Sequence, residues 1–311
     1  MKKLFLLLLM LIFGLVACVN PKEADIVTTM YIQYDIATNI AQDKMSVSML
    51  VAPGAEVHGY EPSSRDIEAI KKAKLFIYTS LEMDAWIKDP DALIGEKTIA
   101  VDLSKAYHHN EDHFHKENMA FKNLNEDHDH DDLHYWTDPI IFLSLIEAVL
   151  EVIVEIDPVN EEFYNENAYN YYEEILALHN EFEEFLLLNH SNKTIYFAGH
   201  NAMGSFAERY NLNIVALSNT SNPDADLTIG QLEALINEIK SSNAKYLFIE
   251  ELKEPKVAKT IQRELVRENY ELELLLLHGY HNISREELNK GVTYGDLFKN
   301  NIENIKIALG G

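Results

Sequence analysis

The chain has 311 residues, of which 26 are Lys or Arg and 51 are Asp or Glu, so its formal net charge is −25 at pH 7. Nucleic-acid phosphates require a basic surface, and this excess of carboxylates argues against nucleic acid as a partner. The length exceeds one typical domain and suits two lobes, each with its own core.

The N-terminus has the pattern of an export signal. Lys2 and Lys3 precede an apolar run over residues 4–17, which is shorter than the roughly 20 residues that a helix needs to span a bilayer. The run ends in Leu-Val-Ala-Cys, which resembles the lipobox of bacterial lipoproteins, and we therefore expect Cys18 to carry a lipid anchor outside the membrane. Because Cys18 is the only cysteine, a disulfide within the chain and a zinc–thiolate site are both excluded.

Short apolar segments then alternate with amphipathic ones, which predicts an α/β lobe. A helix is expected between Pro62 and Ala73, with Pro62 in its first turn and Ser63 as its cap. The expected strands of this lobe cover residues 25–31, 45–51, 74–80 and 98–103.

The segment after these strands is rich in histidine and acidic residues, a composition that is rare unless metal is involved. We interpret residues 108–132 as a loop that binds metal weakly, the alternative being a solvated loop with incidental histidines. Its histidines are His108, His109, His113, His115, His128 and His130.

One long amphipathic pattern covers residues 160–189, with apolar side chains at alternating steps of three and four. A helix of this length would reach about 45 Å. We interpret it as a rigid helix that joins the lobes, with a plain core helix or a coiled-coil seam as alternatives. The expected organisation is a signal peptide at 1–17, an N-terminal lobe at 18–158, a linking helix at 159–190 and a C-terminal lobe at 191–311.

A second α/β series follows the long helix and predicts a second, mainly parallel four-stranded sheet flanked by helices. Thr228 and Gln231 fit a capping box that opens a helix ending near Asn243. The expected strands cover residues 193–198, 212–217, 244–250 and 271–277.

Four histidines occupy positions at which a ligand site is expected. His58, His200 and His281 follow predicted strands, and the carboxyl ends of strands are the edge where open α/β sheets bind ligands. His134 precedes a helix that Asp138 can cap. Each histidine alone is more often a packed or surface residue, but together they predict a site for a divalent metal.

Four motifs give the chain a family resemblance. They are H-x-Y-E-P-[ST] at His58, D-x-H-x-W-x-D-P at His134, H-x-A-[FM]-G-x-[FL]-A-x-[RK]-Y at His200, and the closing T-Y-x-x-L-x-x-x-N-[IL] from Thr293 to Ile302. With them the chain resembles the zinc and manganese solute-binding lipoproteins of ATP-binding-cassette (ABC) importers, the ZnuA and TroA type. The His-rich loop resembles an insertion of many zinc-specific members.

The resemblance implies two α/β lobes joined by a long helix, with one metal ion between them. It implies His58, His134 and His200 as ligands. Where the family typically has Asp as the fourth ligand, this chain has none; we favour His281, with His278, Glu250 or water as alternatives. Carboxylates should orient the ligating rings, and the candidates are Glu61, Asp138 and Glu250.

Imidazole donors suit zinc, whereas added carboxylate oxygens suit manganese. We therefore expect an extracytoplasmic, monomeric protein that carries Zn²⁺ to the membrane permease of an ABC importer without catalysis, with Mn²⁺ or iron as the alternative cargo.

Two alternative hypotheses assign the chain to other functional classes. A secreted zinc hydrolase is disfavoured, because Leu133 occupies a position that the H-x-H-x-D-H signature reserves for histidine and no H-E-x-x-H is present. The other hypothesis is a surface adhesin or structural lipoprotein in which the bound metal only stabilises the fold.

Overall fold

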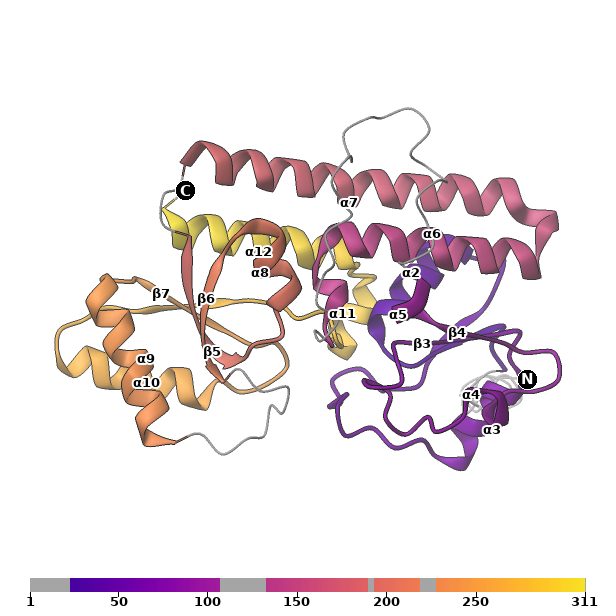
Figure 1. Ribbon diagram of the computed structural model, residues 1–311, viewed down its shortest axis with the longest axis horizontal. Helices are drawn as coiled ribbons and strands as arrows, with labels where there is room; N and C mark the ends of the chain where they lie inside the picture. The colour runs from indigo at the N-terminus through magenta and orange to yellow at the C-terminus, as the bar shows by residue number, and fades with distance from the viewer. Residues whose placement is uncertain (1–22, 107–132, 190–192, 219–227, 311) are drawn as a thin grey trace, which may run out of the picture.

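The computed structural model describes residues 23–106, 133–189, 193–218 and 228–310. Two parallel four-stranded sheets form two lobes, which lie side by side beneath one long helix, α7 (Figure 1). This is the α/β architecture expected from the sequence. Cys18 and the His-rich loop 108–132 lie outside the described residues.

The N-terminal sheet has the strand order β2-β1-β3-β4, and all of its pairs are parallel. Each strand falls inside a predicted segment, shortened at its ends. The elements of this lobe are β1 (Ile26–Thr28), α2 (Tyr31–Ala41), β2 (Val47–Met49), α3 (Ser64–Lys72), β3 (Leu75–Tyr78), α4 (Pro90–Leu93), β4 (Ile99–Asp102), α5 (Leu103–Ala106), η1 (Tyr135–Thr137) and α6 (Pro139–Ile156).

The C-terminal sheet repeats this plan with the order β6-β5-β7-β8, again parallel throughout. Its four strands also match the predicted segments. A short helix, η2 (Pro158–Asn160), and then α7 (Glu161–Asn189) lead into β5 (Thr194–His200), α8 (Gly204–Tyr210), β6 (Asn213–Ser218), α9 (Ile229–Ser242), β7 (Tyr246–Ile249), α10 (Lys256–Arg267), β8 (Glu273–Leu276), α11 (Arg285–Lys290) and α12 (Tyr294–Leu309).

Local capping signals set the helix starts. Ser63 caps α3 and forms a capping box with Asp66, and Thr228 does the same with Gln231 at α9. These side chains satisfy N–H groups that the first helical turn leaves without partners. The prediction that Pro62 lies in the first turn of α3 was wrong, because Ser63 takes the cap and Pro62 precedes it.

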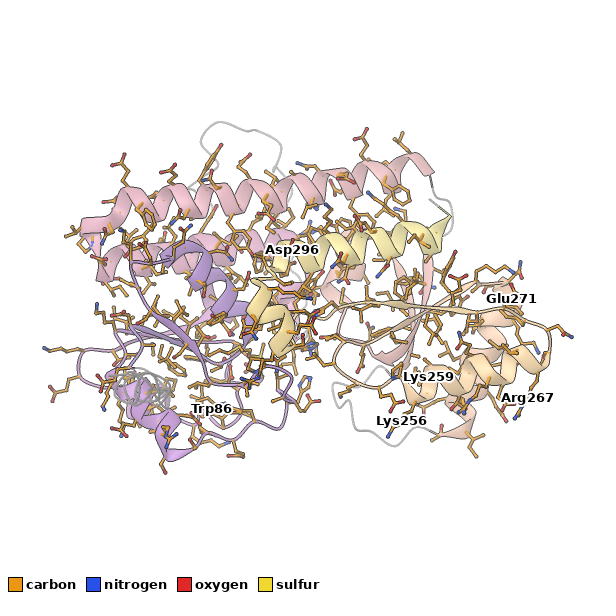
Figure 2. All side chains as sticks on the ribbon, turned by 180° about the vertical axis from the view of Figure 1, so that it is seen from behind. Trp86, Lys256, Lys259, Arg267, Glu271 and Asp296 are labelled. Carbon is orange, nitrogen blue, oxygen red and sulfur yellow. The ribbon has the colours of Figure 1, made fainter. Side chains whose placement is uncertain are left out.

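The long helix buries one face along its length, as its periodicity predicts. Tyr164, Ala168, Ile175 and Phe182 are fully buried. Helix α6 packs beneath one half of α7 and α12 beneath the other, so α7 spans both lobes (Figure 1). Figure 2 shows the same layers from behind, with Asp296 of α12 near the middle of the molecule. None of the helices in the described ranges combines the length and the apolar character that a membrane crossing requires.

One apolar core is shared by the two lobes. It runs from Ile26 of the first strand to Phe206, Phe298 and Ile305 of the C-terminal half. At its centre the rings of Phe142 and Tyr294 stack with centroids 3.7 Å apart and planes at 6°. Each lobe also contains a smaller apolar cluster of its own. The lobes are therefore held to each other by packing as well as by the connecting helix.

Candidate metal centre

Three histidine side chains from distant segments meet between the lobes. His58, His134 and His281 each offer a ring nitrogen, and these nitrogens lie within 4.8 Å of one another. The ring centroids of His134 and His281 are 4.8 Å apart, and that of His58 lies 5.6 Å from each. Neighbouring nitrogens of a tetrahedral zinc site are separated by about 3.3 Å, given Zn–N bonds of about 2.05 Å. Small side-chain movements would bring these rings to ligand geometry.

His58 reaches the cluster from the loop after β2. Glu56 organises this loop, because its Oε1 accepts the backbone N–H groups of Val57 and His58 at 3.1 and 3.4 Å. Its Oε2 forms an ion pair of 3.0 Å with Lys253 of the other lobe. Burial opposes ionisation of Glu56, yet the hydrogen bond and charge of Lys253 hold the pKa of this carboxyl below its usual value. The loop is thus fastened both within its own lobe and across to the other.

His134 lies directly before η1, where its carbonyl accepts the N–H and the hydroxyl of Thr137. Trp136, fully buried, packs edge-on against His134 and His281, with centroids 5.4 and 5.8 Å away. Asp138 caps α6, as expected, and also pairs with Arg209 of the C-terminal lobe at 2.8 Å. His134 is therefore placed by a rigid turn that both lobes clamp.

His281 lies in the loop after β8, and its ring is held by Glu251. The Nδ1 atom of His281 is 3.2 Å from Oε1 of Glu251, and Oε2 accepts the N–H of Gly279 at 3.1 Å. Burial raises the pKa of Glu251, but the nearby imidazole of His278 and the hydrogen bond to His281 outweigh it and hold this pKa well below its usual range. The sequence reasoning did not identify Glu251, whose role depends on two loops meeting.

His278, the alternative to His281, lies outside the three-histidine group. Its Nδ1 accepts the backbone N–H of Tyr280 at 2.9 Å, and its own backbone exchanges hydrogen bonds with Asn301. Burial lowers the pKa of His278, since its ring is almost completely enclosed. Its contacts are those of a residue that shapes the loop.

His200 is the last residue of β5 and pairs with Ser218 of β6 after a register shift. Only its backbone is described. The six histidines of the 108–132 loop and Cys18 are among the residues that the structure does not describe.

The carboxylates proposed to orient the ligands lie in different places. Glu61 is exposed in the loop before α3. The Asp138 carboxylate is occupied by the α6 cap and Arg209. Glu250 lines the cavity beside the histidines, and its side chain packs on Gly199, where an added Cβ would lie 2.5 Å from the carboxylate. Glu251, which was not among these candidates, places its Oε1 3.2 Å from Nδ1 of the cluster residue His281.

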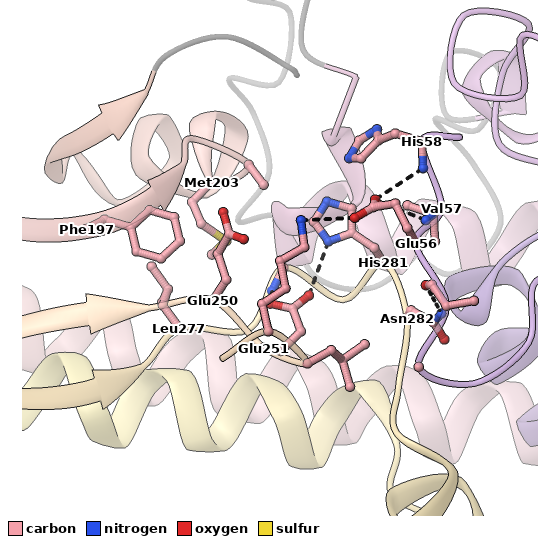
Figure 3. Close-up of a pocket in the computed structure, with 16 residues that line it drawn as sticks. Glu56, Val57, His58, Phe197, Met203, Glu250, Glu251, Leu277, His281 and Asn282 are labelled. Atoms are coloured by element: carbon pink, nitrogen blue, oxygen red, sulfur yellow. Dashed lines mark hydrogen bonds and ion pairs between the residues drawn. The ribbon is translucent and has the colours of Figure 1, made fainter. Parts of the chain in front are cut away.

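A cavity of about 170 Å³ adjoins the cluster at the boundary between the lobes. In Figure 3 the ring of His281 lies between His58 and Glu251, while Glu250 faces Met203 on the side of β5 and β7. Asn282, beside His281, donates hydrogen bonds to the carbonyls of Ala52 and Ala55 in the His58 loop, at 3.0 and 2.6 Å. The arrangement can hold a small cation between nitrogen donors of both lobes.

A family model described as "Zinc-uptake complex component A periplasmic" (ZnuA) matches residues 26–308, which is nearly the whole described chain. The chain belongs to this family. ZnuA-type membership identifies it as a zinc-binding substrate-binding protein of a metal-uptake system, in a family of extracytoplasmic solute-binding proteins rather than enzymes.

Individual relatives agree with this assignment. The high-affinity zinc uptake system protein ZnuA of Bacillus subtilis is 29% identical over 91% of this chain and 87% of its own length. The zinc-binding lipoprotein AdcA of Streptococcus pneumoniae is also 29% identical, over 98% of this chain, which spans 61% of AdcA. The crystal structure of the metal-dependent lipoprotein YcdH from Bacillus subtilis superposes with a TM-score of 0.74 at 27% identity, covering 91% of this chain and 98% of YcdH.

Proposed function

We propose that this protein captures one Zn²⁺ ion between its two lobes and delivers it to an ABC-type metal importer. The observation that carries the proposal is the convergence of His58, His134 and His281, which come from three loops of both lobes and place their ring nitrogens within 4.8 Å of one another. Unrelated packing gives little reason for three imidazoles to be gathered in a largely buried position.

The ligands of the proposed site are His58 and His134 from the N-terminal lobe and His281 from the C-terminal lobe. His200 is the proposed fourth, from its motif and its position at the carboxyl end of β5. Four imidazoles make a site suited to zinc, whose tetrahedral coordination favours nitrogen, more than to manganese, which favours oxygen donors.

Capture requires no covalent chemistry from the chain. Zinc would contact the two N-terminal histidines and the C-terminal ones would complete the coordination, while Trp136 excludes water from one side. The lipid anchor at Cys18 would keep the loaded protein beside the permease, and two or three acyl chains would hold it firmly. The AdcA and YcdH relatives are themselves described as lipoproteins.

Metal analysis and calorimetry on the purified, chelator-treated protein test the proposal. We expect one tightly bound zinc ion per chain. In His58→Ala or His134→Ala, zinc affinity should fall by more than the roughly 10- to 100-fold that is typical when a residue contacting a ligand is replaced. Glu254→Gln, an exposed change outside the cavity, is the control and should bind as the parent does. Undiminished zinc binding in either histidine variant would show that the replaced residue is not a ligand. Zinc-dependent hydrolysis by the purified protein would instead support the hypothesis of a secreted zinc hydrolase.

A further inference from the structure

We propose that Glu251 is a positioning residue that fixes the ring of His281 in the tautomer whose unprotonated Nε2 binds the metal. The inference rests on the proposed function, since it assigns a role in the same site. It concerns a residue that contacts the ligand rather than the ion.

Glu251 lies two residues beyond the end of β7 and its side chain is 11% exposed. Its two oxygens serve two different donors of the β8–α11 loop. Oε2 accepts the backbone N–H of Gly279 at 3.1 Å, and Oε1 lies 3.2 Å from Nδ1 of His281. One carboxylate therefore fastens both the backbone and the ring of the loop that carries the ligand.

The proton arrangement follows from the acceptor. An ionised carboxylate only accepts hydrogen bonds, so the His281 nitrogen that faces it must be the N–H. In a neutral imidazole the other nitrogen then carries the lone pair, which makes Nε2 the ligand atom. The Nε2 atom of His281 is buried, as is that of His134, and the two rings meet edge to face at 4.8 Å.

His278 does not compete for this carboxylate. Its Nδ1 is 3.8 Å from Oε1 of Glu251, beyond hydrogen-bond distance, and already accepts the N–H of Tyr280. Of the two histidines in this loop, His281 is therefore the one that donates a hydrogen bond to Glu251.

Gly279 supplies the space for the contact. A Cβ atom at residue 279 would lie 2.4 Å from Cε1 and 2.7 Å from Nδ1 of His281, and 3.4 Å from Oε1 of Glu251. Only glycine leaves room for the ring this close to the backbone of residue 279 while the ring reaches the carboxylate. In Figure 3 the hydrogen bond leaves His281 on the side away from His58.

Long-range ¹H–¹⁵N spectra of the metal-free full chain test the tautomer, and zinc titrations test its consequence. In the parent we expect His281 to be protonated at Nδ1 and unprotonated at Nε2. In Glu251→Gln, the amide oxygen can accept from only one of the two donors, and the NH₂ group faces the other. If the oxygen keeps the N–H of Gly279, the NH₂ group donates to Nδ1 of His281 and so favours the tautomer protonated at Nε2. Zinc affinity should fall by roughly 10- to 100-fold.

Glu251→Asp keeps the carboxylate on a shorter side chain and should retain the parent tautomer and recover part of the affinity. The control, Glu254→Gln, should change neither readout. A parent His281 protonated at Nε2, or a Glu251→Gln protein with parental tautomer and affinity, would overturn the inference. If Glu251→Gln does not fold, the tautomer of His281 in the parent and the zinc affinity of Glu251→Asp still test the inference. A parent that binds no zinc would overturn the proposed function instead, whatever the spectrum shows.

Discussion

At the scale of single residues, the proposed site is made of nitrogen donors, and His281 stands where the resemblance leads one to expect Asp. Metal preference should follow the donor atoms, because carboxylate oxygens favour manganese relative to imidazole nitrogens. We therefore predict that His281→Asp lowers the ratio of zinc affinity to manganese affinity. Competition titrations of the parent and the variant measure this ratio, and an unchanged ratio would show that residue 281 does not contact the ion.

Gly279 gives a second prediction at this scale. Gly279→Ala places a methyl group against the ring of His281, which must shift away. We expect weaker zinc binding with little loss of helix content, measured by calorimetry and circular dichroism. The control is Gly59→Ala, because a Cβ at residue 59 meets no neighbouring atom within 4 Å and the backbone there is not left-handed. This variant should bind zinc as the parent does.

The sequence pointed to His58 and His134 through their motifs and to His281 through its position after the last predicted strand, but it did not identify Glu251. Glu251 lies about 30 residues from His281 along the chain, and only folding brings them together. Glu61 and Asp138 were reasonable candidates by sequence proximity to the ligands. Asp138 caps α6, as the sequence predicted, and also pairs with Arg209, a partner 71 positions away that local spacing cannot reveal.

At the scale of elements, helix starts and strand positions were predictable because their signals are local. All eight predicted strands are present, since short apolar runs bounded by polar residues encode them. Six predicted segments were longer than their strands by one to three residues at each end, whereas β5 and β6 run past the predicted ends at residues 198 and 217. The start of α3 shows a further limit, because Ser63 and Pro62 were both plausible start signals and the hydrogen bond to Asp66 decided between them.

Helix α6 carries an acid at a buried position, which predicts a pH-dependent stability. Glu147 is 3% exposed, and among the residues that the structure describes its Oε1 has no hydrogen-bond partner. Burial, and then the charge of Glu151, raise the pKa of Glu147 from 4.5 to about 7. The folded state therefore holds the proton of Glu147 more tightly than the unfolded state does. The resulting contribution to the free energy of unfolding is complete below pH 4.5 and is lost as pH rises through 7.

We therefore predict that Glu147→Gln, which mimics the protonated acid, is more stable than the parent at pH 8 and equal to it at pH 4. The shift sets an upper limit of about 3 kcal/mol on the gain at pH 8, given 1.36 kcal/mol per pKa unit. Urea unfolding at both values of pH measures it. Glu155→Gln, an exposed change on the same helix, should show no such difference. Equal stability of parent and Glu147→Gln at pH 8 would contradict the assignment.

At the scale of the whole molecule, the two lobes are tied by a common core and by polar bridges. Besides the Lys253–Glu56 and Arg209–Asp138 ion pairs, Tyr31 donates its hydroxyl to the carbonyl of Val292, 261 residues away. Packed cores do not deform continuously. Two lobes and a linking helix could be expected from the order of elements, but the sharing of one core between the lobes could not, because periodicity shows which face is buried and not what covers it.

This shared core predicts small movements on zinc binding. We expect the backbone to move by no more than about 1 Å on zinc binding, as in pre-organised binding partners. The radius of gyration, measured by solution X-ray scattering, should then be almost the same in metal-free and zinc-loaded protein. A larger decrease on adding zinc would indicate a wide hinge closure and would contradict the view that packing holds the lobes together.

The central claim is that imidazoles from both lobes enclose a single zinc ion, and X-ray absorption spectroscopy of the protein loaded with one equivalent of zinc tests it most directly. We predict a coordination sphere of nitrogen donors at about 2.0 to 2.1 Å with imidazole scattering, which loses an imidazole in each of His58→Ala, His134→Ala and His281→Ala. An ion whose coordination is unchanged in all three variants, or is dominated by carboxylate oxygens, would contradict the account.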